Sequence, residues 1–380
     1  MTRMDSNLVN LNMSLASVQN ILTGSETYAT AKSLQQFQVF GLKTKLKPPK
    51  AHTISSLPGS KLIIDLDQLH RVLPMDCLSI CDAKVSALQR KFVGLAEKAV
   101  AVEVTGIEVF STPTLMLMKK WHRVMEAVSR IDKSKEWIQC IDLKNDFPKH
   151  FEVEHSDDLF KKLENIPLNR ESIHALDLAA RGCIGDDTMC VVAEKLFGTD
   201  PNVTLIDPSH LGIILNGEIT VNTDNITAFL RANSCDVVLI PVNCNRNHWC
   251  SIMVRSSSRE VHIYDPMSSK YVTFVRAAAQ KLIHLLRKTA DEPSYSVHLY
   301  SSDVGVQYDS YNCDIYVLLS FEHFTGAPQL GRGDKKMLQC LRYRTYACAT
   351  ARNSEEHIKT FIMHWERSRH YKRVKKFKSD

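Results

Sequence analysis

The sequence predicts an α+β fold for residues 166–350, with a separate region before it. Three short strand-like runs follow one another directly along the chain, and the helical patterns lie before and after them. Strands grouped in this way indicate α+β, whereas regular alternation with helices would indicate a parallel α/β sheet. With 380 residues, 44% of them hydrophobic, the chain can bury a substantial core and hold a second region of comparable length.

The first 165 residues contain no catalytic motif. Residues 1–60 are rich in Ser, Thr and Asn and carry a Lys- and Pro-rich stretch, so we expect an irregular or loosely packed segment. Residues 61–165 form a region to which the sequence assigns no role. Its apolar segments lie at 62–66, 84–97, 100–109 and 114–131, and we expect helices in the second and the last.

The domain at 166–350 combines segments of helical and of strand periodicity. We expect helices at 187–197, 274–288 and 335–346, another that begins near Cys313, and strands at 237–242, 249–254, 261–264 and 297–300. Residues 351–380 are expected to form a C-terminal helix and a basic tail. The basic residues of the tail are Arg367, Arg369, Lys372, Arg373, Lys375, Lys376 and Lys378.

Four residues of this domain have the side chains that a thiol hydrolase needs. Cys313 offers a nucleophile, His248 a base that forms the thiolate, and Asp265 a carboxylate that fixes the tautomer of the base. The amide of Gln307 offers a donor to the developing oxyanion. Asp265 follows His248 by 17 positions, and Cys313 follows Gln307 by 6.

The spacing of His248 and Asp265 fits a β-hairpin with a Ser-rich turn. If the turn is centred between Ser256 and Ser257, the two residues are directly opposed on antiparallel strands. Opposed residues have Cβ atoms about 4.5–5.5 Å apart, which allows an imidazole–carboxylate hydrogen bond. A one-residue bulge would remove this opposition.

The spacing of Gln307 and Cys313 fits a loop that leads into a helix. Asn312 is in the position of a helix cap. The residues that follow Cys313 at helical intervals are Ile315, Leu318, Leu319 and Glu322. A thiol at a helix N-terminus lies at the positive end of the helix dipole, which lowers its pKa and prepares the nucleophile.

At these residues the chain resembles the ubiquitin-like-specific cysteine proteases, the SUMO/sentrin protease family, whose fold is shared with the adenovirus protease. The resemblance covers His248-Trp249, Asp265, Gln307 and the segment from Cys313 to Val317. Upstream, residues 183–196 resemble the family's Trp-Leu-Asn-Asp-Glu entry into the first helix of its catalytic domain. The resemblance spans residues 165–350 and implies a papain-like, adenovirus-protease-like domain with a central mixed sheet flanked by helices.

The resemblance also implies a function. His248, Asp265 and Cys313 would be catalytic and Gln307 would stabilise the oxyanion, with no metal or organic cofactor. The substrate would be the carbonyl beside the C-terminal glycine of a ubiquitin-like, SUMO-like modifier, and the partners would be that modifier and its conjugates. The residues that would contact the substrate are Cys183, Asp186, Trp249 and Asp314.

Three positions depart from the family pattern, and the first is Asn312, which stands where the family usually has Asp. Asp314 stands where the family has Gly, so we expect its charge to raise the pKa of Cys313, its side chain to narrow the cleft, and activity to be low. Cys183 stands where the family has a Trp that helps to enclose the Gly-Gly tail. Trp249 would then be the remaining aromatic side chain that encloses the Gly-Gly tail of the substrate.

Other functions share some of these residues. The same Cys-His-acid layout serves acyltransferases among bacterial effectors, and an inactive relative could only bind a ubiquitin-like protein or accompany a mobile element. Cys244, His248 and Cys250 are candidate metal ligands. The chain contains no Cys-x-x-Cys pair, however, and Cys250 should point to the opposite face of its strand from Trp249.

Composition limits the setting. No apolar run of 18 residues occurs, so we expect no transmembrane helix and no membrane partner, and residues 1–6 lack the pattern of a secretory signal. Eleven scattered cysteines indicate a reducing compartment, the nucleus or cytoplasm. Part of the net charge of +6 lies in the basic tail, which could direct nuclear import or be an ordinary solvated terminus. Contact with nucleic acid is possible only through this tail.

Overall fold

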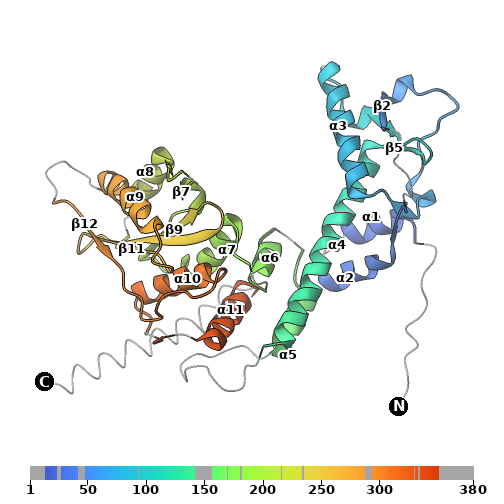
Figure 1. Cartoon of the computed structure of the whole chain (residues 1–380). Coiled ribbons are helices and arrows are strands. Elements are labelled where there is room, and N and C mark those ends of the chain that lie inside the picture. The colour runs from blue at the N-terminus through green and yellow to red at the C-terminus, as the bar shows by residue number, and fades with distance from the viewer. Residues whose placement is uncertain are drawn as a thin grey trace, which may run out of the picture. The chain divides into compact units, whose positions relative to one another are not determined.

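The computed structural model describes most of the chain between residues 13 and 350 and divides it into two compact units (Figure 1). One unit is formed by the residues up to 132 with 164–169, and the other by 133–163 and the residues from 170 onward. The described residues are 13–23, 27–41, 48–92, 94–141, 156–168, 170–179, 182–214, 216–232, 235–286, 293–328, 330–332 and 334–350. The basic tail lies outside them.

The first unit combines short helices with small sheets. Its helices are α1 (Leu15–Thr23), α2 (Tyr28–Lys32), α3 (Met75–Lys91) and the first part of α4 (Thr112–Gln139). Its strands are β1 (Gln38–Val39), β2 (Lys50–Thr53), β3 (Arg71–Val72), β4 (Val100–Glu103) and β5 (Val109–Ser111). β2, β4 and β5 form an antiparallel sheet, and β1 pairs with β3 in parallel.

Part of the segment expected to be irregular is helical. In α1, Leu15, Val18 and Leu22 are buried, and their spacing places them on one face of the helix. This apolar face is short and its neighbours in the sequence are Ser and Asn residues. The helix therefore cannot be recognised from the composition of the segment. The apolar segment at 62–66 contributes an isolated bridge from Ile63 to Val109.

The second unit is built on a seven-stranded mixed sheet in the order β12-β11-β10-β9-β7-β8, with β6 also paired to β9. β10 is antiparallel to both β9 and β11, and β7 is antiparallel to β8. β12 runs parallel to β11, and β6 and β7 run parallel to β9. The strands are β6 (Val203–Leu205), β7 (Leu211–Ile213), β8 (Ile219–Val221), β9 (Val237–Cys244), β10 (His248–Arg255), β11 (Glu260–Tyr264) and β12 (Ser296–Leu299). The α+β prediction is confirmed.

Helices cover both faces of this sheet (Figure 1). α9 packs its buried Val275 and Leu282 against alternate residues of β9, β10 and β11. α10 lies against the other face, where the hydroxyls of Ser251 and Ser320 are 3.5 Å apart. The helices are α5 (Ser156–Glu164), α6 (Arg170–Ala175), α7 (Asp186–Phe197), α8 (Thr223–Ala232), α9 (Tyr271–Leu286), α10 (Cys313–Phe324) and α11 (Lys335–Thr350). Among the described helices none is long and apolar enough to cross a bilayer.

The hairpin of β10 and β11 has a different register from the one that we expected. Its pairs run from Arg255 opposite Glu260 to Ser251 opposite Tyr264, which centres the turn between residues 257 and 258. The prediction that His248 and Asp265 lie directly opposite each other is therefore wrong. In the observed register the residue opposite Asp265 would be Cys250, two positions after His248. The physical reason is a four-residue turn, in which Arg259 adopts a left-handed conformation with φ of 55°.

A buried arginine ties the start of α10 to two other segments. Arg342, on α11, is 3% exposed, and its Nη1 lies 3.1 Å and 3.2 Å from the two carboxylate oxygens of Asp314. The same nitrogen donates to Asn312 Oδ1 at 3.1 Å. Nε donates to the Leu178 carbonyl at 2.8 Å, and Nη2 to the Gly182 carbonyl at 2.6 Å. A buried charge is costly unless it is paired and hydrogen-bonded, and here Arg342 is both.

We predict that Arg342→Met lowers the free energy of unfolding by about 3–5 kcal/mol, because it leaves the Asp314 carboxylate buried without its cation. Urea denaturation measures this loss. The double variant Arg342→Met/Asp314→Leu removes both charges and should recover most of it. A double variant no more stable than the single one would contradict the assignment of the cost to the stranded carboxylate.

Candidate active site

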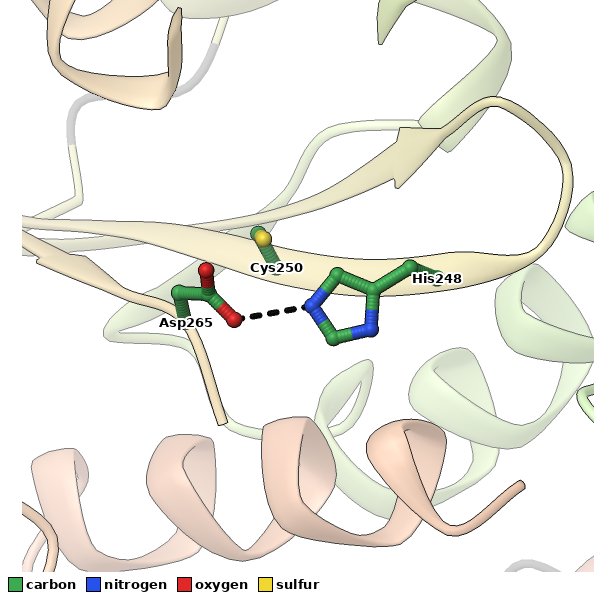
Figure 2. A group of neighbouring side chains, drawn as sticks. All are labelled: His248, Cys250 and Asp265. Atoms are coloured by element: carbon green, nitrogen blue, oxygen red, sulfur yellow. Dashed lines mark hydrogen bonds and ion pairs between the residues drawn. The ribbon is translucent and has the colours of Figure 1, made fainter. Parts of the chain in front are cut away.

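Three of the expected catalytic residues come together at the ends of secondary-structure elements. His248 is the first residue of β10, Asp265 follows the last residue of β11, and Cys313 is the first residue of α10. Figure 2 shows His248 and Cys250 on β10, with the ring of His248 turned toward Asp265. In the observed register Asp265 lies one step beyond the last pair, toward Cys250, so it reaches His248 diagonally across the hairpin.

The His248–Asp265 pair is held rigidly. His248 Nε2 lies 2.8 Å from Asp265 Oδ1, and both side chains are buried. The carboxylate also accepts hydrogen bonds from Ser269 N at 2.8 Å, Ser269 Oγ at 2.6 Å and Met267 N at 3.0 Å. Tyr271 stacks on the imidazole with ring centroids 5.7 Å apart. The ring is thereby fixed with Nε2 toward Asp265, which leaves Nδ1 for the thiol.

The charges of this pair follow from its contacts. Burial would raise the pKa of Asp265, but the hydrogen bonds from His248 and Ser269 outweigh burial and hold the pKa below its ordinary value. Burial disfavours the charged form of His248, yet its hydrogen bonds to Asp265 and Cys313 raise its pKa to about 9. Near neutral pH the site therefore contains an imidazolium beside a carboxylate.

Cys313 has the environment of a thiolate. A hydrogen bond from Cys183 and those from His248 and the Trp249 backbone lower the pKa of Cys313 to about 5, against the opposing effect of burial. The sulfur atoms of Cys183 and Cys313 are 3.4 Å apart. Cys313 also opens α10, where the helix dipole favours a negative charge. The thiol is only 1% exposed.

Gln307 lies in the loop before α10, and its amide is already engaged. Gln307 Nε2 donates to the Asp309 carbonyl at 2.8 Å and lies 3.2 Å from Asp309 Oδ1. The backbone N–H of Gln307 donates to the Pro266 carbonyl at 2.8 Å, which joins this loop to the loop that holds Asp265. The Cys313 N–H, at the first residue of α10, has no partner within the helix.

Asp309 organises the turn into α10, a role that was not predicted from the sequence. Its carboxylate accepts from Tyr311 N at 3.1 Å, Asn312 N at 2.9 Å and Asn312 Nδ2 at 2.7 Å. Asn312 occupies the cap position but makes no capping hydrogen bond with its side chain. An Asp two residues before the first of these N–H groups is the pattern of an Asx turn, and it could have been recognised.

Asp314 and Trp249 do not border a cleft in this structure. Asp314 is 0% exposed and paired to Arg342, so the expectation that it narrows the cleft is not met. Burial raises the pKa of Asp314 to about 6 against the opposing charge of Arg342. Trp249 is 1% exposed and donates from Nε1 to the Ile184 carbonyl at 2.8 Å. The indole therefore anchors the segment of Ile184. It is not exposed in a way that would let it enclose a substrate tail.

The other two expected substrate residues are more exposed than Asp314 and Trp249. Cys183 is half-buried beside Cys313. Asp186 is exposed at the start of α7 and accepts a hydrogen bond from the Asn243 side chain. Cys183 thus contacts the nucleophile, whereas Asp186 contacts β9 through Asn243.

The alternative of a metal site draws on the same atoms. One ligand atom from each of His248, Cys250 and Asp265 can be chosen so that all lie within 4.8 Å of one another (Figure 2). Cys244 is paired with His248 across β9 and β10. However, His248 Nε2 and both oxygens of Asp265 are already committed to hydrogen bonds, and a metal ion would have to displace them. The donor set therefore fits a proton-transfer pair better than a metal centre.

Comparison with known proteins finds one family to which these residues are similar. Residues 221–344 match the model of the Ulp1 protease family, C-terminal catalytic domain. None of the curated proteins matches the chain. The matched segment includes His248, Asp265, Gln307 and Cys313, while Cys183 and Asp186 precede it.

Several solved structures are similar at low sequence identity. The SUMO protease Ulp1 with its catalytic cysteine oxidised to a sulfinic acid is 15% identical, with a TM-score of 0.41, over 53% of this chain and 96% of that one. The Ulp1 protease domain in complex with Smt3, the yeast ortholog of SUMO, is 13% identical, with a TM-score of 0.38, over 58% and 94%. The Xanthomonas campestris effector XopD bound to ubiquitin is 16% identical, with a TM-score of 0.29, over 43% and 91%.

The resemblance read from the sequence is thus confirmed by the family match, although that match covers about a third of the chain. The segment that it covers supplies β9, β10, β11, β12 and α10, which together position the cysteine, the histidine and the aspartate. Residues 221–344 carry a cysteine-peptidase domain of the Ulp1 protease type.

Proposed function

We propose that this domain is a cysteine peptidase or isopeptidase that cleaves after the C-terminal glycine of a ubiquitin-like, SUMO-like modifier. The observation that supports the proposal most strongly is the placement of His248 between Asp265 and Cys313, within the segment that matches the Ulp1 family. The substrate class comes from the resemblance to the ubiquitin-like-specific proteases. A reducing compartment, the nucleus or cytoplasm, suits a thiolate enzyme and belongs to this proposal.

The first step would be attack by the Cys313 thiolate on the carbonyl carbon of the glycine. His248 holds the proton taken from the thiol, and Asp265 keeps the ring oriented and stabilises its positive charge. His248 then donates this proton to the leaving amine, which departs and leaves a thioester on Cys313. Water, deprotonated by the now neutral His248, hydrolyses the thioester and returns Cys313 to the thiolate.

The oxyanion of each tetrahedral intermediate would be stabilised at the start of α10. The Cys313 N–H and the helix dipole point toward this position. Gln307 would add a second donor once its amide turns from Asp309, which is 2.8 Å away. Because Cys313 and Trp249 are almost completely buried, we infer that substrate entry displaces the segment at 182–185 that covers them.

Cys313→Ala should abolish cleavage of a SUMO precursor that carries residues beyond its Gly-Gly sequence, because the variant lacks the attacking sulfur. Gel analysis of the processed precursor measures this, and circular dichroism checks that the variant is folded. Cys190→Ser is the matched control, since Cys190 bonds to Asp207 on another part of the unit and should retain activity. Undiminished cleavage by Cys313→Ala would exclude this mechanism.

The rate of Cys313 alkylation by iodoacetamide should rise with pH through a midpoint near 5, because the thiolate is the reactive form and the pKa is lowered to about 5. Below the midpoint the thiol is protonated and slow to react. His248→Ala should move the midpoint to higher pH, since the imidazolium that favours the thiolate is lost. Mass spectrometry of the Cys313 peptide after timed alkylation gives both profiles. Coincident profiles would show that His248 does not face the thiol.

His248→Ala should lower turnover more than Gln307→Ala. The first change removes the base and the proton donor, whereas removal of one oxyanion donor costs about 10²–10³-fold in turnover and leaves the Cys313 N–H in place. Steady-state kinetics on the same precursor rank the two variants. A smaller loss for His248→Ala than for Gln307→Ala would contradict the roles assigned here.

A further inference from the structure

Two cysteines of the site lie in sulfur–sulfur contact. Cys183 Sγ and Cys313 Sγ are 3.4 Å apart, about the sum of two sulfur radii, and the residues are 130 positions apart in the sequence. A disulfide bond requires about 2.05 Å. A disulfide therefore requires the two sulfur atoms to approach by rather more than about 1 Å from their present contact.

The segment that carries Cys183 is fixed from both sides. The Gly182 carbonyl accepts from Arg342 at 2.6 Å, and the Ile184 carbonyl accepts from Trp249 at 2.8 Å. Arg342 also holds Asp314, the residue after Cys313. The contact of the two sulfurs is therefore set by the same framework that positions the nucleophile.

The two cysteines differ in chemistry. Cys313 has a lowered pKa and offers a thiolate, the form that peroxides oxidise. The pKa of Cys183 is raised, first by its hydrogen bond to Cys313 and then by burial, so Cys183 remains a thiol beside it. Cys183 is also the more exposed of the pair, being half-buried where Cys313 is buried.

We propose that Cys183 and Cys313 form a site of reversible oxidative modification, in which a peroxide converts the pair to a disulfide and thereby switches the nucleophile off. The proposal rests on the nucleophilic Cys313 of the proposed function, but it does not depend on which modifier is the substrate. A reduced thiol at residue 183 is what distinguishes this site from one that holds a lone reactive cysteine.

The chemistry balances in two steps. The Cys313 thiolate attacks one oxygen of hydrogen peroxide, the O–O bond breaks, and the departing hydroxide takes up a proton to become water, leaving a sulfenic acid. The sulfur of Cys183 then attacks Cys313 Sγ; the S–S bond forms, the S–O bond breaks, and the hydroxyl leaves with the Cys183 proton as water. A dithiol reductant restores both thiols, with its thiolate attacking the more accessible Cys183 sulfur.

The test treats the full chain with a molar excess of hydrogen peroxide, enough to carry an unprotected thiolate beyond the sulfenic acid. Free thiols are then blocked by alkylation, and linked peptides are identified by mass spectrometry. We expect a peptide pair joined through Cys183 and Cys313 that disappears after dithiothreitol. Alkylation of Cys313 should be lost on oxidation and recover with the reductant. This readout needs no protease substrate, so it distinguishes failure of this proposal from failure of the proposed function.

Cys183→Ser provides the decisive comparison. Without a resolving thiol, Cys313 should proceed to sulfinic and sulfonic acids, and its alkylation should not recover with dithiothreitol. Cys190→Ser should behave like the unmodified chain, because Cys190 is also half-buried but contacts Asp207. Recovery in Cys183→Ser equal to that of the unmodified chain would overturn the proposal, as would oxidation of Cys313 with no linked peptide. Circular dichroism confirms that the variants are folded.

Discussion

The buried ion pair of Arg342 and Asp314 is the constraint on which the site depends. It joins α11 to the first turn of α10, so the position of Cys313 follows from the packing of two helices. The remaining donors of Arg342 hold the Leu178 and Gly182 carbonyls, which brings the segment of Cys183 to the same place. Asp314 thus has a structural role, in which its buried carboxylate is paired with Arg342.

The second constraint is the hairpin of β10 and β11. Its register sets Asp265 diagonally from His248, and the turn at 265–269 surrounds the carboxylate with N–H and O–H donors. A histidine on a strand whose neighbours are buried on both faces has little freedom to rotate. The base is therefore oriented before substrate arrives, which lowers the reorganisation needed in the reaction.

Much of the fold and of the candidate site could be predicted from residue pattern. The strands at 237–264, the helix that begins at Cys313 and the choice of His248, Asp265 and Cys313 follow from periodicity, order and spacing. The register of the hairpin could not, because it depends on the left-handed conformation of Arg259, a residue that rarely adopts it. Arg342 could not be recognised either, since an arginine in a helical pattern reads as a surface residue.

The most direct measurement of the central claim is covalent labelling with a panel of ubiquitin-like proteins whose C-terminal glycine carries an electrophile. We predict an adduct with a SUMO-like protein, and peptide mass spectrometry should map it to Cys313. The adduct should be absent from the His248→Ala variant near neutral pH. An adduct on another cysteine, or no adduct with any member of the panel while Cys313 still reacts with iodoacetamide, would contradict the claim that this site processes a ubiquitin-like modifier.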